Sequence, residues 1–175
     1  MTAYRITPES SRVGIEARSS IHPIHGEGAG LRGELDVELD GSGLDLSAPV
    51  RMRLECPVSA LESGNPLNDR ELRRRIEAER YPVTVGEARE VTAAARPGRY
   101  RVCGDLTFHG VTREVDGEIT VTVPGADASA AALVIEGEQM FDIRDFGVPP
   151  PRILMLRVQP DVRVRVHVEA ARPAG

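Results

Sequence analysis

YRVCGDLTFHGVTREVDGEITVTV, residues 100–123, is the stretch of sequence that decides the fold. Apolar residues occupy its even positions as far as His109-Gly110 and its odd positions after that dipeptide. A period of two that changes parity across two residues predicts a β-hairpin with a two-residue loop. The predicted cross-strand pairs are Phe108 with Val111, Leu106 with Arg113, Gly104 with Val115, Val102 with Gly117, and Tyr100 with Ile119. One face of the hairpin is therefore almost wholly apolar, and the other is polar and faces solvent.

The composition fits one domain over residues 1–175 and argues against nucleic acid as a partner. The 27 acidic side chains outnumber the 22 basic ones, and the isoelectric point is near 5.5. Phosphate binding needs a basic face, and residues 73–75 form the only basic cluster. Trp is absent and aromatic residues make up 3% of the chain, so a platform for stacking bases is not expected.

The N-terminal segment, MTAYRITPESSR, lacks the charged and apolar regions of a secretory signal. No later segment has the long apolar run of a transmembrane helix. We therefore expect a cytoplasmic protein without stable membrane insertion. The cysteines agree, because Cys56 falls on the apolar parity of its strand and Cys103 on the polar parity of the hairpin. Opposite faces of a sheet would keep them apart, so two free thiols are expected.

Alternation of apolar and polar residues continues along the chain and predicts roughly eight strands. The predicted strands are residues 12–18, 31–39, 50–58, 82–91, 100–108, 111–123, 131–140 and 154–169. Pro160-Asp161 predicts a bulge or bend in the last one, whereas the Gly-rich residues 20–30 predict a loop that leads into an irregular strand. Strands at this spacing indicate a sandwich or a barrel. We favour an all-β, eight-stranded antiparallel β-barrel, because closure hides the sheet edges.

One short α-helix is predicted between strands, over residues 66–79, where the apolar period changes. Pro66 stands near its start, and good helix formers follow. Leu72 and Ile76 lie one turn apart and would form a narrow buried stripe. Pairs of opposite charge at a spacing of four residues support the helix: Asp69 with Arg73, Glu71 with Arg75, and Arg73 with Glu77.

The barrel interior has two possible states. A barrel of about eight strands is either just filled by its side chains or holds one small ligand. Small residues at positions taken as inward favour a cavity, although glycine also marks bends and corners. These residues are Gly14, Ala17, Gly33, Gly104 and Gly117.

Four stretches resemble motifs of the YceI-like family, the polyisoprenoid-binding proteins, and they occur in that family's order. They are YRITPESSRVGIEAR at 4–18, LNDRELRRRIEAERYPVTV at 67–85, GDLTFHGVTREV at 104–115 and FDIRDFGVP at 141–149. The resemblance covers essentially the whole chain and implies a lipocalin-like barrel around a long apolar tunnel. It also implies a long-chain lipid inside, a homodimer, no catalytic residues, no metal and no cofactor. The chain departs from the family pattern at Arg75-Ile76, where a Phe pair is usual, and at Val85, where an aromatic residue is usual.

The sequence therefore favours a non-catalytic protein that holds an apolar ligand, such as an isoprenoid, an isoprenoid quinone or a fatty-acyl compound, inside the barrel. Each buried CH₂ group contributes about 0.8 kcal/mol, so a few isoprene units would suffice for tight binding. For every residue in the expected lining, plain core packing is the alternative. The expected lining is Val13, Ile15, Leu35, Val37, Met52, Leu54, Val102, Leu106, Phe108, Arg113, Val115, Ile119, Phe146, Leu156 and Val158.

Two polar features leave other functions open. Arg113 has inward parity, and it would either meet a ligand's head group or extend to water near the hairpin tip. Asp142, Arg144 and Asp145 would either tie their loop to the barrel or belong to a lid. With these groups an enzyme acting on an apolar substrate is one alternative. A stress-related interaction module with a packed barrel is another.

The histidines give weak indications of chemistry. His22 and His25 have a spacing that suits two metal ligands, but Pro23 lies between them and no third ligand is evident, so no metal site is expected. His109 is expected in an exposed turn at the hairpin tip.

Overall fold

The computed structural model describes residues 2–41, 43–125, 131–150, 152–153 and 156–174. Leu154 and Met155, at the start of the last predicted strand, lie outside the described residues. No helix among the described residues is long and apolar enough to cross a membrane.

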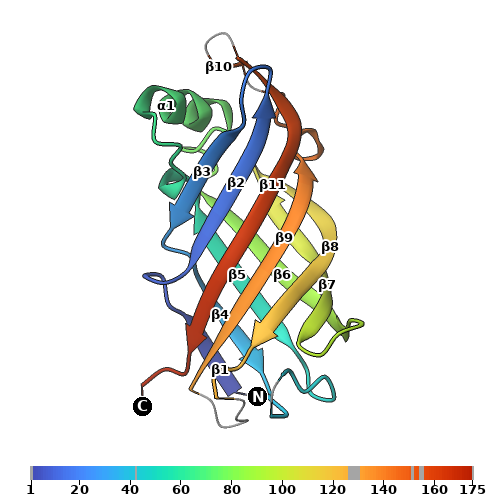
Figure 1. Cartoon of the computed structure of the whole chain (residues 1–175). Coiled ribbons are helices and arrows are strands. Elements are labelled where there is room, and N and C mark those ends of the chain that lie inside the picture. The colour runs from blue at the N-terminus through green and yellow to red at the C-terminus, as the bar shows by residue number, and fades with distance from the viewer. Residues whose placement is uncertain (1, 42, 126–130, 151, 154–155, 175) are drawn as a thin grey trace.

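The chain forms a closed antiparallel β-barrel, as predicted (Figure 1). Its sheet runs in the order β1-β4-β5-β6-β7-β8-β9-β11, and pairing of β1 with β11 closes the ring. The strands are β1 (Thr2–Ile6), β2 (Arg12–Ser19), β3 (Ile24–Ala29), β4 (Arg32–Val37), β5 (Arg51–Pro57), β6 (Val83–Ala93), β7 (Arg99–Phe108), β8 (Val111–Thr122), β9 (Ala132–Asp142), β10 (Arg152–Ile153) and β11 (Leu156–Ala171). The helices are α1 (Pro66–Arg75) and the short 3₁₀ segments Val58–Ala60 and Ile143–Phe146.

The ring has eight strand positions, although more than eight strands are named. Two of these positions are each formed by two strands that follow one another end to end. β1 and β2 pair with successive parts of the same edge of β11, while β4 pairs with β1 and β3 with β2. Residues 7–11 separate β1 from β2, and residues 30–31 separate β3 from β4. α1 lies at one end of the barrel and both termini lie at the other (Figure 1).

The β7–β8 hairpin has the predicted register at all five pairs, from Phe108 with Val111 to Tyr100 with Ile119. His109 and Gly110 have positive φ angles of 53° and 71°, as a type I′ turn requires at both central residues. Tyr81 packs directly on Gly110, where a Cβ would lie 2.5 Å from the tyrosine ring. Turn geometry and close packing therefore both require glycine at this position.

Two strands at the N-terminal side differ from prediction. β1 was not predicted, because only Tyr4 and Ile6 carry its short apolar alternation. The prediction of an irregular segment over residues 20–30 was wrong in part, since β3 pairs regularly with β2. Glycine at position 28 lets Leu61 pack closely on β3, because a Cβ on Gly28 would lie 2.9 Å from the Leu61 side chain.

A bulge in β6 reverses which residues face inward. The register between β6 and β7 shifts between Ala88 and Glu90. Val91 faces inward opposite Val102, but Val85 pairs with outward-facing Thr107, so one parity does not hold over residues 82–91 as predicted. The register of β11 against β2 also shifts, between Val158 and Val162, which confirms the predicted irregularity at Pro160-Asp161.

The helix ends at Arg75 rather than at the predicted residue 79. The N–H of Ala78 donates to the Arg73 carbonyl at 2.9 Å, and that of Glu77 to the Arg74 carbonyl at 3.2 Å. With Glu77 at a φ of 51°, these two bonds form a Schellman motif. The left-handed residue in this motif is usually glycine. Because Glu77 takes that place here, the sequence contains no signal for the end of the helix.

Only one of the predicted helix charge pairs forms as such. Arg75 binds Glu71 at 2.9 Å, and Arg74 binds the same carboxylate. Asp69 is instead buried and accepts hydrogen bonds from the backbone and the hydroxyl of Ser63. It therefore anchors the segment before the helix to the helix's first turn.

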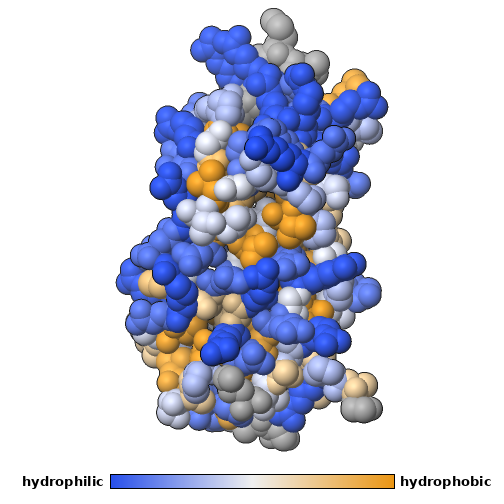
Figure 2. All heavy atoms as spheres, turned by 180° about the vertical axis from the view of Figure 1, so that it is seen from behind, coloured by the Kyte–Doolittle hydropathy of each residue, from blue (hydrophilic) through white to orange (hydrophobic). Residues whose placement is uncertain are grey.

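Cross-strand ion pairs cover the outer wall. Among them, Arg101 binds Asp116 at 2.8 Å, and Arg99 binds Glu118 at 3.0 Å. Figure 2 shows the back of the molecule, where hydrophobic residues gather in patches separated by charged ones. The polar outer face predicted for the hairpin is confirmed.

Candidate functional site

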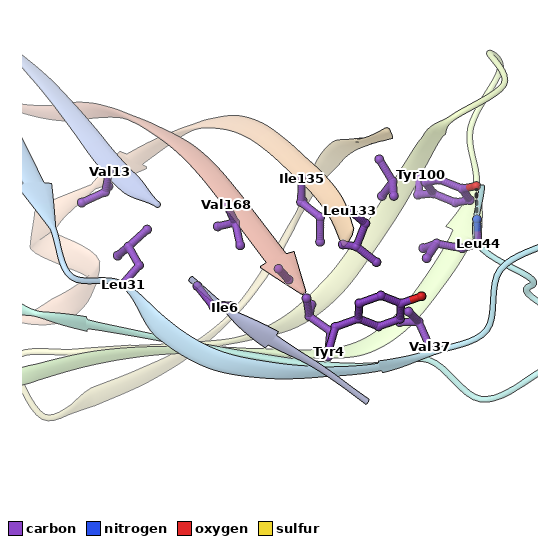
Figure 3. Close-up of a cluster of buried hydrophobic side chains, with 13 residues drawn as sticks. Tyr4, Ile6, Val13, Leu31, Val37, Leu44, Tyr100, Leu133, Ile135 and Val168 are labelled. Atoms are coloured by element: carbon purple, nitrogen blue, oxygen red, sulfur yellow. Dashed lines mark hydrogen bonds between the residues drawn. The ribbon is translucent and has the colours of Figure 1, made fainter. Parts of the chain in front are cut away.

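The inner face of the barrel is apolar, but its two ends are packed differently. At the end that holds the termini, the inward side chains interlock as a core, which we call the packed half (Figure 3). Its members are Tyr4, Ile6, Val13, Leu31, Leu35, Val37, Leu44, Tyr100, Val121, Leu133, Ile135, Val168 and Ala170.

Tyr100 lies at the end of the packed half, beside Leu44 (Figure 3). Its hydroxyl accepts a hydrogen bond of 2.7 Å from the backbone N–H of Leu44, in the loop between β4 and β5 (Figure 3). A side chain on Gly43 would collide with the same hydroxyl. The loop and Tyr100 therefore pack against each other and close the barrel at this end.

Toward α1, inward side chains of the same strands are only half-buried. On β8, Val121 is 2% exposed, whereas Val115 has the same parity and is half-buried. On β11, Val168 is 4% exposed, whereas Val164 is half-buried. Residue type and parity are the same, so the difference shows that solvent reaches Val115 and Val164 but is kept from Val121 and Val168. We call the inner face toward α1 the open half. It comprises Ile15, Met52, Leu54, Cys56, Val102, Leu106, Phe108, Val111, Val115, Phe141, Val162 and Val164. Of these, Ile15, Met52, Leu54, Cys56 and Val164 pack against the packed half, and Val162 packs against Ala17 and Val158.

The small residues contribute unequally to space inside the barrel. Gly14 pairs with Arg165 and faces outward, so its predicted inward position was wrong. Gly33 and Gly104 are sites of close approach, because a Cβ there would collide with the carbonyl oxygens of Arg53 and Glu87. In contrast, a Cβ on Gly86, opposite Leu106, would meet nothing within 4 Å. That glycine leaves room inside the open half.

The predicted lining residues divide between the two halves. Val13, Leu35 and Val37 belong to the packed half. Ile119 is half-buried and packs against the same core, whereas Val158 forms a small separate cluster with Ala17. Leu156 is half-buried at the start of β11. The open half contains the others on the strands: Val102, Leu106, Phe108 and Val115, together with Ile15, Met52 and Leu54, which pack against the same core as Ile119 does.

Phe146 is buried and joins an aromatic group at the α1 end of the barrel. Its ring centroid lies 5.9 Å from that of Phe108 and 6.5 Å from that of Phe141, each in an edge-to-face arrangement. The 3₁₀ segment Ile143–Phe146 thereby places an aromatic side chain beside the inner face of β7 and β9.

Arg113 has the inner parity of β8 but is exposed. Its Nε donates to the backbone carbonyl of Asp145 at 2.9 Å. Arg144 pairs with Asp142 inside the same loop, and its hydrogen bonds hold the pKa of the Asp142 carboxyl below its usual value. The loop is thus tied to the hairpin through a backbone carbonyl rather than through the Arg144 side chain.

His109 joins three segments at the α1 end, a role that was not predicted. Its Nε2 lies 2.7 Å from Glu77 Oε2, just beyond the helix, and its Nδ1 lies 3.0 Å from the Phe146 carbonyl oxygen. Tyr81 packs on the imidazole at 5.2 Å between ring centroids. The side chain is only 13% exposed, so the expectation of an exposed turn residue was wrong.

The two cysteines are free and face opposite sides, as predicted. Cys56 pairs with Thr84 on the inner face, and Cys103 pairs with Asp116 on the outer face. Burial raises the pKa of the Cys56 thiol to about 11. It is therefore an uncharged group in the wall of the open half near neutral pH.

No group of three potential metal ligands occurs among the described residues. His25 lies 3.5 Å from Glu16 on the outer wall, while a ring nitrogen of His22 contacts the carbonyl of Pro23. The two histidines are thus in separate local contacts.

A groove of about 810 Å³ crosses the outer wall where β8 and β9 separate. Their pairing ends at Ile119 with Gly137. About half of the groove's lining residues are charged, and most of these are paired, as in the Arg165–Glu138 contact of 3.0 Å; Val13, Gly117 and Val166, which have inner parity, also line it. This groove is a solvated surface and lacks the apolar character of the interior.

Residues 4–170 match the model of a protein family described as the YceI-like domain. No curated protein matches the chain. Similar solved structures include BcnA of Burkholderia cenocepacia, with 16% identity, a TM-score of 0.77, and coverage of 95% of this chain and 99% of that one. A polyisoprenoid-binding domain from Saccharophagus degradans has 14% identity, a TM-score of 0.72, and coverage of 99% and 100%. The YceI protein of Campylobacter jejuni has 15% identity, a TM-score of 0.67, and coverage of 89% and 88%.

Proposed function

Because the chain belongs to the YceI-like family, we propose that it binds an apolar small molecule in the open half of its barrel and catalyses no reaction. The observation that carries the proposal is the loss of burial along one inner face, from Val121 to Val115 on β8 and from Val168 to Val164 on β11. The similar structure from Saccharophagus degradans is a polyisoprenoid-binding domain, which supports the same ligand class.

Apolar burial is sufficient to drive such binding. Each CH₂ group moved from water into the open half contributes about 0.8 kcal/mol before ordering costs are subtracted. The half-buried side chains of the open half would also be covered by the ligand. Isoprenoids, isoprenoid quinones and fatty-acyl compounds all have suitable chains.

Arg113 and the loop over residues 142–146 were the candidates for catalysis. The hydrogen bond from Arg113 to the Asp145 carbonyl, and the Arg144–Asp142 pair, support a structural role for these groups. Conversion of a bound apolar compound that disappears in Arg113→Leu, with the fold retained, would favour an enzyme instead.

The test is to identify what the protein carries. Protein purified from its native host is extracted with organic solvent, and the extract is analysed by mass spectrometry. We expect an apolar compound with a fatty-acyl or isoprenoid chain in stoichiometric amount. A reproducibly empty protein that also fails to bind isoprenoids and fatty amides in solution would refute the proposal.

A further inference from the structure

We propose that the open half is a blind pocket that accepts a single apolar chain of about 12 bonds, with its polar group left at the α1 end. This inference rests on the proposed function and adds a limit on ligand length. It commits to medium-chain amphiphiles rather than to long polyprenyl chains that would thread the barrel.

The floor of the pocket is the boundary between the two halves. On β9 the last fully buried inward residue is Ile135, which is 6% exposed and pairs with Val121 and Val168. Below it, Leu133 is 1% exposed. Tyr100 closes the space beneath through its bond to Leu44. A chain entering from the α1 end therefore meets packed side chains at this level.

The depth of the open half follows from strand geometry. Val102 and Phe108 mark its extent on β7, and six residue steps of about 3.3 Å make roughly 20 Å along the strand. Strands in a barrel tilt by about 40°, which leaves about 15 Å along the axis. An extended chain advances roughly 1.2 Å per bond, since three backbone bonds span one residue. The pocket therefore holds about 12 bonds.

The polar end of the ligand belongs at the α1 end for a separate reason. The floor offers only apolar side chains, and the walls are apolar except at Thr84 and Gln139, which pair with Cys56 and Val164. Burying a polar group without a partner is costly. Arg113 and the backbone of the segment Ile143–Phe146 lie at the α1 end. A head group there can keep its contact with water or with these groups.

A chain-length series tests the inference. Delipidated protein is titrated calorimetrically, below micellar concentrations, with straight-chain fatty acids from octanoic to octadecanoic acid. We expect affinity to rise about fourfold for each added methylene up to dodecanoic or tetradecanoic acid and then to stop rising. Farnesol should bind at least as well as geranylgeraniol. A rise that continues through octadecanoic acid and geranylgeraniol would overturn the blind pocket but leave the proposed function intact.

Two variants should change, in opposite directions, the chain length at which the affinity stops rising. Val164→Phe fills the open half and should stop the rise in affinity at a shorter acid, whereas Ile135→Ala lowers the floor and should stop it at a longer one. Leu133→Ala removes a side chain beneath the floor and should leave the limit unchanged. Unaltered limits in both Val164→Phe and Ile135→Ala would contradict the inference. Failure of every acid and alcohol to bind would refute the proposed function, and the pocket with it.

Discussion

The hydroxyl oxygen of Tyr100 lies 2.7 Å from the backbone nitrogen of Leu44 and accepts its hydrogen bond within the barrel. This contact joins the first strand of the central hairpin to the loop after β4. It closes the end of the barrel at which both termini lie. The opposite end, where α1 and the hairpin tip meet, is the end at which we propose that a ligand enters.

Removing that hydroxyl should destabilise the fold. In Tyr100→Phe the buried N–H of Leu44 loses its partner, and a buried unpaired donor costs about 1–3 kcal/mol. The free energy of unfolding in urea measures this change. Tyr81→Phe is the control, because phenylalanine keeps the ring that packs on His109. Equal stability of Tyr100→Phe and wild type would show that the contact does not close the barrel.

His109 should hold the α1 end together. Its two ring nitrogens lie within hydrogen-bonding distance of Glu77 and of the Phe146 carbonyl, so one side chain joins the segment after α1 to the loop after β9. His109→Ala should therefore speed hydrogen exchange of the amides of Gly147 and Val148, which bond within the adjoining loop. The matched control is His25→Ala on the outer wall. Unchanged exchange at both amides would contradict this role.

His167 should make stability depend on pH. Hydrogen bonds to Glu169 and then Glu136 raise the pKa of His167 in the folded state. The folded protein therefore holds this proton more tightly than the unfolded chain does, and the contribution is complete below pH about 6.5 and lost as pH rises through the folded value. The same bond lowers the pKa of Glu169, so the pair also weakens in strong acid.

Comparison of wild type with His167→Gln isolates this effect. The difference in their free energies of unfolding should be largest at mildly acidic pH and should shrink toward pH about 8. His22→Gln, altered at an exposed histidine, should show no such trend. A difference that grows as the pH rises would contradict the assignment.

The rate at which the two thiols are modified should report on ligand binding. Cys56 faces the open half and Cys103 faces the outside, so a bound ligand should shield only Cys56 from a maleimide. At a dodecanoic acid concentration roughly ten times the Kd, modification of Cys56 should slow about tenfold. Peptide mass spectrometry follows both sites, and Cys103→Ser confirms the assignment. Equal slowing at both cysteines would indicate that the ligand does not occupy the interior.

The sequence predicted the hairpin register because a two-residue turn fixes it locally. β1 could not be found in this way, since its pairs join residues far apart, such as Thr2 with Val37. The bulge after Ala88 was equally hidden, because one extra residue in β6 changes parity without changing composition. The contacts of His109 were not predicted for a related reason, because its partners Glu77 and Phe146 lie 32 and 37 residues away in the sequence.

The candidate site could be predicted only as a list of inward positions. Val115 and Val121 are the same residue on the same face of β8, yet one is half-buried and the other is 2% exposed. Val121 pairs with Ile135 of the neighbouring strand β9, whereas Val115 lies beyond Ile119 and Gly137, where the β8–β9 pairing ends. Parity identifies the inner face, but only the packing shows which part of it is free to receive a ligand.

The most direct test of ligand binding in the open half is to locate a bound chain among the valines of the inner wall. Methyl-labelled protein is mixed with dodecanoic acid, and nuclear Overhauser contacts are recorded between the chain and the valine methyl groups. We predict contacts to Val115 and Val164 in the open half and none to Val121 and Val168 in the packed half. Contacts confined to outward-facing Val83 and Val85, or reaching Val121 and Val168 without those to Val115 and Val164, would contradict this account.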